Sequence, residues 1–170
     1  MTVYTIGHST RPIDEFLHLL EAHRVQRLLD VRTIPKSRHN PQFGQDQLSQ
    51  SLERAGIGYT HMPALGGLRR PRKDSTNMGW RNTSFRGYAD YMQTPQFQTA
   101  LEQCLELASG QRVALMCAEA VPWRCHRSLI ADALVARGFD VREIVSATDS
   151  RPHMLTPWAR VDGVMVTYPG

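Results

Sequence analysis

The chain has 170 residues and a mass of 19.3 kDa, with 41% hydrophobic and 21% charged residues. This composition is typical of a globular protein, and the length suits a single hydrophobic core. No run approaches the roughly 20 apolar residues of a membrane helix, and no basic segment precedes an apolar block at the N-terminus, which argues against a membrane or secreted protein. Three cysteines are too few for a disulfide scaffold. We therefore expect a cytoplasmic protein with reduced thiols.

The basic residues are almost all arginines. The formal net charge is +4, and of the 20 basic residues only Lys36 and Lys73 are lysines. Arginine presents a planar fork that suits phosphate, carboxylate or nucleic acid, although the codon usage of a GC-rich genome produces the same bias. The positions of the arginines must therefore decide between the two explanations.

Strands and helices alternate in the first part of the chain. Apolar residues at intervals of three and four predict helices, and short apolar or β-branched runs predict strands. The predicted elements are a strand at 3–7, a helix at 12–23, a strand at 28–32, a helix at 46–55 and a strand at 57–62.

The second part repeats the alternation after an irregular segment. Residues 66–84 show no periodicity, and a segment of that length is usually functional or disordered. The elements predicted after it are a helix at 94–109, a fully apolar strand at 113–117, a helix around 129–134 and a last core strand at 141–145. In the Pro-rich tail, Asp162 and Gly163 separate two short apolar runs and predict a β-hairpin.

This order of elements predicts a three-layer α/β fold, with a largely parallel sheet between helices and a C-terminal β-hairpin. We expect residues 1–146 to form one domain and residues 147–170 to form an extension packed on it. Ligands of such sheets bind beyond the carboxyl ends of the strands. Polar residues at these ends are therefore the candidates for a site.

Four predicted strands end in polar residues. The clearest case is the segment from Cys117 to Arg127, where a buried strand ends at one cysteine and a helix begins near another, Cys125. The remaining strand ends carry His8, the pair of Asp30 and Arg32, and two adjacent glycines at 66–67. Because the carboxyl ends of parallel strands share one edge, we expect these residues to meet in one crevice.

Five short motifs together resemble a known family. They are Thr-Ile-Gly-His-Ser at 5–9, Asp-Val-Arg at 30–32 with Pro35 and Ser37, Leu-Gly-Gly at 65–67, Phe-Arg-Gly-Tyr-Ala-Asp-Tyr-Met at 85–92, and Cys-Ala-Glu at 117–119 with Cys-His-Arg at 125–127. In this order they resemble the bacterial and archaeal family called domain of unknown function 488, over about residues 5–145. The resemblance implies an α/β fold and a shared cysteine and histidine site. It implies no established reaction.

The candidate site residues divide by their chemistry. Thiol, imidazole and carboxyl groups are candidates for catalysis, and arginines and a tyrosine are candidates for binding an anionic substrate. The catalytic candidates are His8, Cys117, Glu119, Cys125 and His126. The substrate-binding candidates are Arg32, Arg86, Tyr88 and Arg127.

Two interpretations of the cysteines stay open. Seven residues separate Cys117 from Cys125, which is too many for a structural zinc knuckle, but a single metal ion bound by Cys117, Cys125 and His126 fits the residue types. Alternatively, Cys125 is a reactive thiol, because a helix start and neighbouring arginines favour the thiolate. We favour the free thiol. The identity of any cofactor is left open.

The function predicted from these residues is that of an enzyme acting on an anionic substrate by cysteine, histidine or acid–base chemistry. The substrate classes are phosphorylated, nucleic-acid-derived or sulfur-bearing compounds. A second hypothesis is a non-catalytic module that binds nucleic acid or senses a metal with the same basic crevice. A closed pocket favours the enzyme, whereas an open basic groove favours the module. The sequence does not indicate an oligomeric state.

Overall fold

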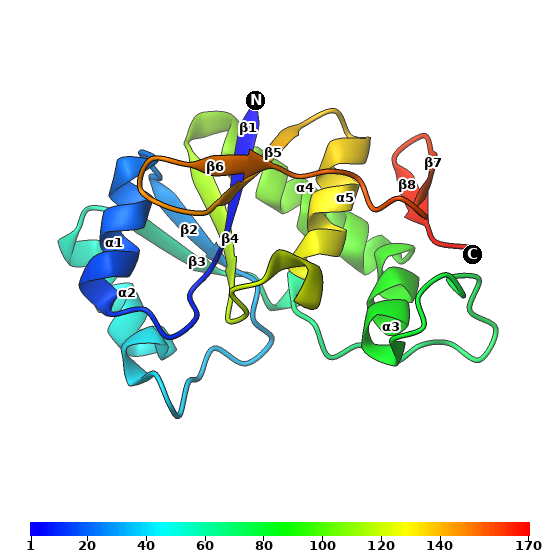
Figure 1. Ribbon diagram of the computed structural model, residues 1–170, viewed down its shortest axis with the longest axis horizontal. Helices are drawn as coiled ribbons and strands as arrows, with labels where there is room; N and C mark the ends of the chain where they lie inside the picture. Colours follow the sequence, from blue (N-terminus) through cyan, green and yellow to red (C-terminus); the bar gives the residue numbers. More distant parts are fainter.

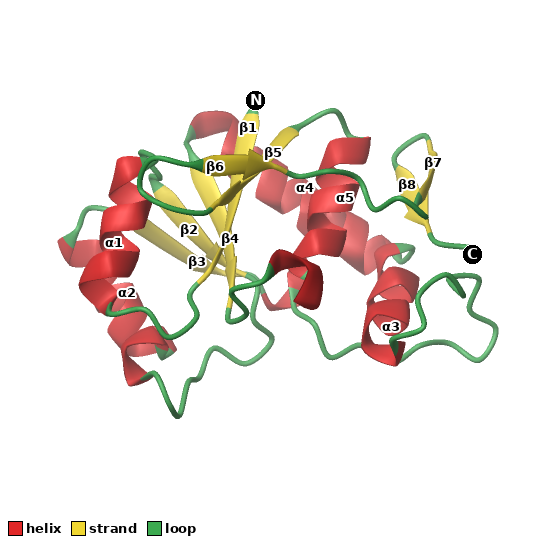
Figure 2. Ribbon diagram, in the orientation of Figure 1, coloured by secondary structure: helices red, strands yellow, loops and turns green.

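The computed structural model describes residues 1–170 and contains one six-stranded sheet between two layers of helices (Figures 1 and 2). The strand order is β3-β2-β4-β1-β5-β6, in which β1 to β5 are parallel and β6 pairs antiparallel with β5 at one edge. The strands of this sheet are β1 (Thr2–Gly7), β2 (Arg27–Asp30), β3 (Gly58–His61), β4 (Val113–Cys117), β5 (Asp140–Ile144) and β6 (Ser150–Pro152). A separate hairpin follows, formed by β7 (Arg160–Asp162) and β8 (Met165–Thr167).

Helices cover both faces of the sheet. One face packs against α1 (Ile13–Ala22) and α2 (Gln45–Arg54), and the other packs against α3 (Thr83–Met92), α4 (Pro95–Gly110) and α5 (Arg127–Ala136). Three single-turn 3-10 helices, η1 (Pro41–Phe43), η2 (Pro63–Leu65) and η3 (Pro122–Arg124), lie in the connecting segments. The predicted three-layer α/β fold with a C-terminal hairpin is confirmed.

The alternation of side chains along the strands divides the core in two. In β1, Tyr4 and Ile6 join the cluster under α1 and α2, whereas Val3 joins the cluster under α4 and α5. All five residues of β4 are buried, because this strand lies in the middle of the sheet and is covered on both faces. Thr5 and Glu143 point to the same face as Val3 because side chains on one face of a strand are two residues apart. Two polar side chains therefore lie under α5.

The irregular segment at 66–84 is ordered by one buried carboxylate. Asp90 of α3 is 5% exposed, and it accepts hydrogen bonds from the backbone N–H of Arg72, the hydroxyl of Ser75 and the amide of Asn77. The Asn77 side-chain oxygen in turn accepts from the backbone N–H of Tyr168 in the tail. The segment and the C-terminal tail are thus held against α3 and against each other.

A second buried carboxylate holds the tail to α5. Asp132 is fully buried and accepts hydrogen bonds from His153 Nε2 at 2.8 Å, from the Thr156 backbone N–H at 3.0 Å and from the Tyr168 hydroxyl at 2.7 Å. These contacts hold the tail against α5, after β6 has run antiparallel along β5 and the His153 N–H has bonded to the Val141 carbonyl. None of the five α-helices has the length and apolar character that a membrane crossing requires.

The connections of two neighbouring strands diverge at the carboxyl edge. β1 lies beside β4, but the chain leaves β1 toward α1 on one face and leaves β4 toward α5 on the other. Such a divergence opens a crevice, which is where open α/β sheets bind their ligands. The predicted site residues at 7–9 and 117–127 flank this point.

Candidate functional site

The ends of β1 and β4 are joined by backbone hydrogen bonds. The N–H of His8 donates to the Cys117 carbonyl at 2.9 Å, and the N–H of Ser9 donates to the Ala118 carbonyl at 3.0 Å. Ser9 has a φ of 51°, in the left-handed region that non-glycine residues rarely adopt. A Cβ atom at Gly7 would overlap the backbone of residues 119–120. This close approach explains the glycine and brings the two loops together.

Arg127 organises the start of α5. It is 1% exposed, and its guanidinium donates to Cys117 Sγ at 2.7 Å, to the carbonyls of Glu119 and Ala120, and to both carboxylate oxygens of Glu143. A guanidinium has five N–H groups, and these contacts use all of them. Arg127 was predicted to bind substrate, but the structure gives it no N–H free for a ligand.

The carboxylate of Glu143 is the partner that the sequence analysis missed. It lies in β5, where Arg127 Nη2 donates to Oε1 at 2.6 Å, and Arg127 Nε and the Thr5 hydroxyl donate to Oε2. The side chain keeps 13% exposure. A charged residue inside a strand predicted as core was the available signal, because carboxylates are buried only with partners.

Cys117 and Cys125 are paired. Their sulfur atoms are in disulfide contact, and their Cα atoms are 7.4 Å apart. The expectation that these cysteines are unpaired thiols is therefore wrong in this structure. Cys117 ends β4 and Cys125 lies just before α5, and both side chains point into the same core cluster. Both residues are nearly inaccessible, with exposures of 2% and 6%.

The partly buried His126 and the buried Tyr88 form an aromatic pair next to these sulfur atoms. The ring centroids are 5.0 Å apart, and the Tyr88 hydroxyl donates to the Leu65 carbonyl at 2.7 Å. His126 Nε2 lies 3.0 Å from the Val31 carbonyl and must donate to it, which leaves Nδ1 as an acceptor facing Cys125 Sγ at 3.6 Å. Burial lowers the pKa of His126 to about 4. The imidazole is therefore neutral near pH 7.

His8 is buried on the face of the sheet opposite to Cys117 and Cys125. It is 3% exposed, stacks on Phe43 with centroids 4.3 Å apart, and directs Nδ1 to the Ser9 carbonyl at 2.8 Å. Its Nε2 is buried without a hydrogen-bond partner. Burial, as the main cause, lowers the pKa of His8.

Arg32 is held by Asp30 rather than facing open space. Arg32 Nε and Nη2 donate to the two carboxylate oxygens of Asp30 at 2.9 and 2.7 Å, and Nη1 donates to the Phe43 carbonyl at 2.7 Å. Asp30 also accepts from the Tyr59 hydroxyl at 2.6 Å. This bidentate pair is 7% and 0% exposed.

Two of the predicted site residues lie apart from this group. Arg86 of α3 donates through Nε to the Trp80 carbonyl at 3.0 Å and is not hydrogen-bonded to the other predicted site residues. Glu119 is exposed and turns back to accept from the Val121 backbone N–H at 3.3 Å. The structure therefore brings the side chains of Cys117, Cys125, His126, Arg127 and Tyr88 together on one face of the sheet. The side chains of His8 and Arg32 lie with Phe43 on the other face.

The arrangement gives no support to the metal interpretation. No group of three or more His, Cys, Asp or Glu side chains is arranged to hold a metal ion. Cys117, Cys125 and His126 are neighbours, but their donor atoms are directed at one another and at backbone carbonyls.

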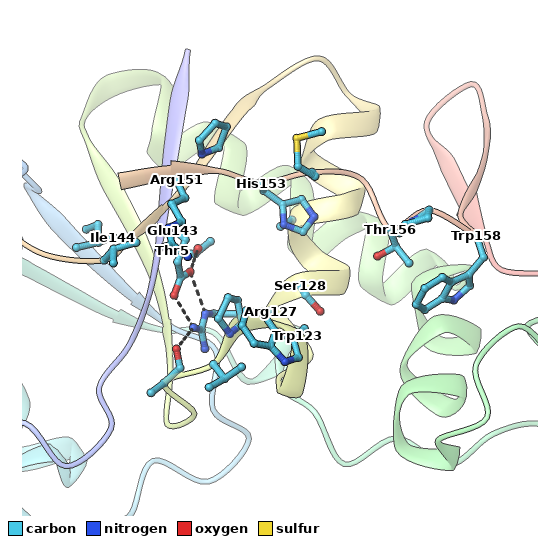
Figure 3. A pocket seen from close by; sticks show the side chains of 18 of the residues that line it. Thr5, Trp123, Arg127, Ser128, Glu143, Ile144, Arg151, His153, Thr156 and Trp158 are labelled. Carbon is cyan, nitrogen blue, oxygen red and sulfur yellow. Dashed lines mark hydrogen bonds and ion pairs between the residues drawn. The ribbon is translucent and has the colours of Figure 1, made fainter. Parts of the chain in front are cut away.

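A cavity of about 690 Å³ lies beside the Arg127–Glu143 pair (Figure 3). Its walls come from α5, β5, η3 and the tail at 151–158. In Figure 3, Thr5, Glu143 and Arg127 face one another on one wall, and Trp158 lies at the end farther from this pair. Neither Cys117 nor Cys125 lines the cavity. Glu143 is the one carboxylate that does.

Two arginines on the cavity wall keep donors free. Arg151 of β6 is exposed and makes no side-chain hydrogen bond or ion pair. Arg11 follows β1; its Nε and Nη1 make long contacts of 3.4 Å to the Gly7 carbonyl and to Glu15, and Nη2 makes none. These two side chains, unlike those of Arg127 and Arg32, keep N–H groups that no other group of the protein occupies.

The family model described as "Domain of unknown function DUF488" matches residues 12–134. The chain belongs to the DUF488 family. The resemblance stated from the motifs is thereby confirmed. No curated protein and no solved structure matches the chain.

The DUF488 match covers only part of the cavity wall. Trp80, Trp123 and Arg127 lie within residues 12–134, whereas Glu143 and the tail that closes the cavity follow the matched range. The cavity of this DUF488 protein is thus built jointly by the matched region and by the C-terminal part of the chain.

Proposed function

We propose that this protein is an enzyme that binds an anionic substrate in the cavity and acts on it by acid–base chemistry, with Glu143 as the reacting carboxylate. The observation that carries the proposal is the placement of Glu143 on the wall of a 690 Å³ cavity, fixed by Arg127 and Thr5, with Arg11 and Arg151 on the same wall.

Acid–base chemistry fits this geometry better than thiol chemistry. Cys117 and Cys125 are 2% and 6% exposed and do not line the cavity, so a substrate bound there does not reach their sulfur atoms. Glu143 does line it, and Oε1 accepts only one hydrogen bond, from Arg127, which leaves a lone pair to take a proton from water. The water oxygen then bonds to the phosphorus or sulfur of an ester substrate, the bond to the alcohol breaks, and the proton passes to the leaving alcohol. Cys117, by its hydrogen bond with Arg127, acts as a positioning residue.

The charges around the cavity favour an anion. Glu143 is neutralised by Arg127, so the remaining charges of the lining are those of Arg151, which is unpaired, and of Arg11, which makes only a long contact of 3.4 Å with Glu15. Cations that line a concave site raise the local concentration of anionic ligands. The buried Arg127–Glu143 pair keeps its geometry while a ligand binds, because its donors and acceptors are held by the sheet and by α5.

Turnover of a panel of anionic esters tests the proposal. Phosphomonoesters, phosphodiesters and sulfate esters are incubated with the wild type, with Glu143→Gln and with Glu102→Gln, an exposed carboxylate of α4. We expect at least one class to be turned over, kcat to fall at least about 100-fold in Glu143→Gln, and Glu102→Gln to match the wild type.

Two results would contradict the proposal. One is turnover of none of these classes by the wild type. The other is full activity of Glu143→Gln, which would exclude its carboxylate from the reaction.

A further inference from the structure

The cavity contains more aromatic surface than an anion alone requires. The chain has three tryptophans, and all three, Trp80, Trp123 and Trp158, line this one cavity. Trp123 and Trp158 are 69% and 46% exposed. Large exposed aromatic rings in a concave site are typical of ligand binding, because each ring offers a broad apolar face at low entropic cost.

The position of Trp158 is fixed by its neighbours. Its ring packs edge-on against Trp80, with centroids 5.0 Å apart and an angle of 74° between the planes. Trp80 in turn contacts the rings of Phe85 and Tyr168. The indole of Trp158 is therefore supported on one side, and its other surface is available to a planar ligand.

The charged groups and Trp158 lie toward different parts of the cavity. Glu143 and Arg151 come from the adjacent strands β5 and β6, and Arg11 follows β1. In Figure 3, Trp123 lies next to Arg127, whereas Trp158 of the tail lies farther from the Arg127–Glu143 pair than Arg151 does. A ligand that fills the cavity thus meets cations and one indole at one end and the indole of Trp158 at the other.

We propose that the cavity binds a nucleoside phosphate, with the base stacked on tryptophan and the phosphate paired with Arg11 and Arg151. This inference rests on the proposed function, because it names the substrate class of the same cavity. Bases stack on aromatic side chains whatever their sequence, and an arginine fork matches phosphate geometry. The volume lies within the range of small-molecule sites, roughly 300 to 1,000 Å³.

The nucleoside phosphate can be a free nucleotide or the end of a single strand. Both present one base and one phosphate to the cavity, and the recognition is the same. Titrations with adenosine 5′-monophosphate and with a short single-stranded oligonucleotide distinguish a free nucleotide from the end of a strand. The compound that binds more tightly identifies the ligand.

Calorimetric titration of the full chain tests the inference. We expect adenosine 5′-monophosphate to bind at least about ten-fold more tightly than adenosine, which lacks the phosphate, or ribose 5-phosphate, which lacks the base. The double variant Trp123→Leu/Trp158→Leu should weaken binding of the nucleotide and of adenosine but not of ribose 5-phosphate. The double variant Arg11→Gln/Arg151→Gln should weaken the nucleotide and ribose 5-phosphate but not adenosine.

The matched controls are exposed residues outside the cavity. Arg160→Gln in β7 and Leu68→Ala, whose side chain is 81% exposed, should bind the nucleotide as the wild type does. Trp123 and Arg151 are themselves exposed, so their replacement should leave folding intact.

The outcomes separate this inference from the proposed function. Equal affinity for ribose 5-phosphate and the nucleotide, or no effect of Trp123→Leu/Trp158→Leu, would overturn the nucleoside phosphate and leave the anionic substrate in place. Failure of every phosphate-bearing probe to bind would overturn the nucleoside phosphate, and together with turnover of no ester class it would overturn the proposed function as well.

Discussion

Arg127 connects the two halves of the site. Its guanidinium contacts the sulfur of Cys117 on β4 and the carboxylate of Glu143 on β5, so one side chain joins two strands that are not neighbours in the sheet. Removing one partner of a buried ion pair leaves an uncompensated charge, whereas removing both can be nearly neutral.

We expect Arg127→Met to lower the free energy of unfolding by about 3–5 kcal/mol, because Glu143 is then left without its counter-charge. The double variant Arg127→Met/Glu143→Gln should be more stable than Arg127→Met alone. Urea denaturation of the wild type, both single variants and the double variant measures this coupling. A double variant less stable than both single variants would contradict the account of the pair.

The free energy of unfolding should depend on pH through His126. Burial lowers the pKa of His126 to about 4, below its ordinary value of 6.5. Between pH 6.5 and pH 4 the unfolded chain binds a proton that the folded chain does not, so the stability contributed by neutral His126 is present above pH 6.5 and lost as the pH falls. This loss is about 3 kcal/mol over that range.

Urea denaturation at several pH values checks the sign and the source. The free energy of unfolding should fall from pH 7 to pH 4, and His126→Asn should reduce the slope, while His18→Asn, a surface substitution in α1, should not. Because burial also lowers the pKa of His8, part of the slope should remain in His126→Asn. An unchanged slope in that variant would contradict the assignment.

At the scale of elements, the strands and helices were largely predictable, and the contacts between them were not. The helices α1, α2 and α4 lie within a few residues of the predicted ranges, since their apolar periodicity is strong. Strand β6 was missed because three residues ending in a proline show no alternation. Glu143 was missed as a site residue because its partner Arg127 lies sixteen positions earlier and only the fold brings them together.

The segment at 66–84 is held against α3 by a single carboxylate. Asp90 holds it through three hydrogen bonds, so Asp90→Ala should release it while α3 and α4 remain folded. We expect native-state trypsin cleavage after Arg72 and Lys73 to become at least about ten-fold faster, because proteolysis follows the population of the opened segment. Asp74→Ala, whose exposed carboxylate pairs only with Arg72, is the control. Equal cleavage rates in the wild type and Asp90→Ala would contradict this role.

At the scale of the whole molecule, the C-terminal tail is a structural part of the cavity. The tail supplies His153, Thr156 and Trp158 to its wall, and Asp132 of α5 binds the first two by hydrogen bonds. The composition of the tail predicted an extension with a hairpin. Only the structure reveals that Asp132, in the middle of a predicted apolar helix, binds the tail to α5 by hydrogen bonds.

We therefore expect Asp132→Ala to open the cavity without unfolding the sheet. Hydrogen exchange of residues 153–168 should become much faster, while exchange in β1 and β4 should stay slow, because the lost contacts are confined to the tail. Nucleotide binding should weaken in the same variant. Unchanged exchange in the tail would contradict the role of Asp132.

We place the ligand in the cavity beside Glu143 and not at the cysteine pair. A crystal structure of the full chain grown with adenosine 5′-monophosphate tests this placement. We expect the phosphate within hydrogen-bond distance of Arg11 or Arg151 and the base stacked on Trp123 or Trp158. A nucleotide bound against Cys125 and His126, with the cavity empty at a concentration that saturates the protein in solution, would contradict it.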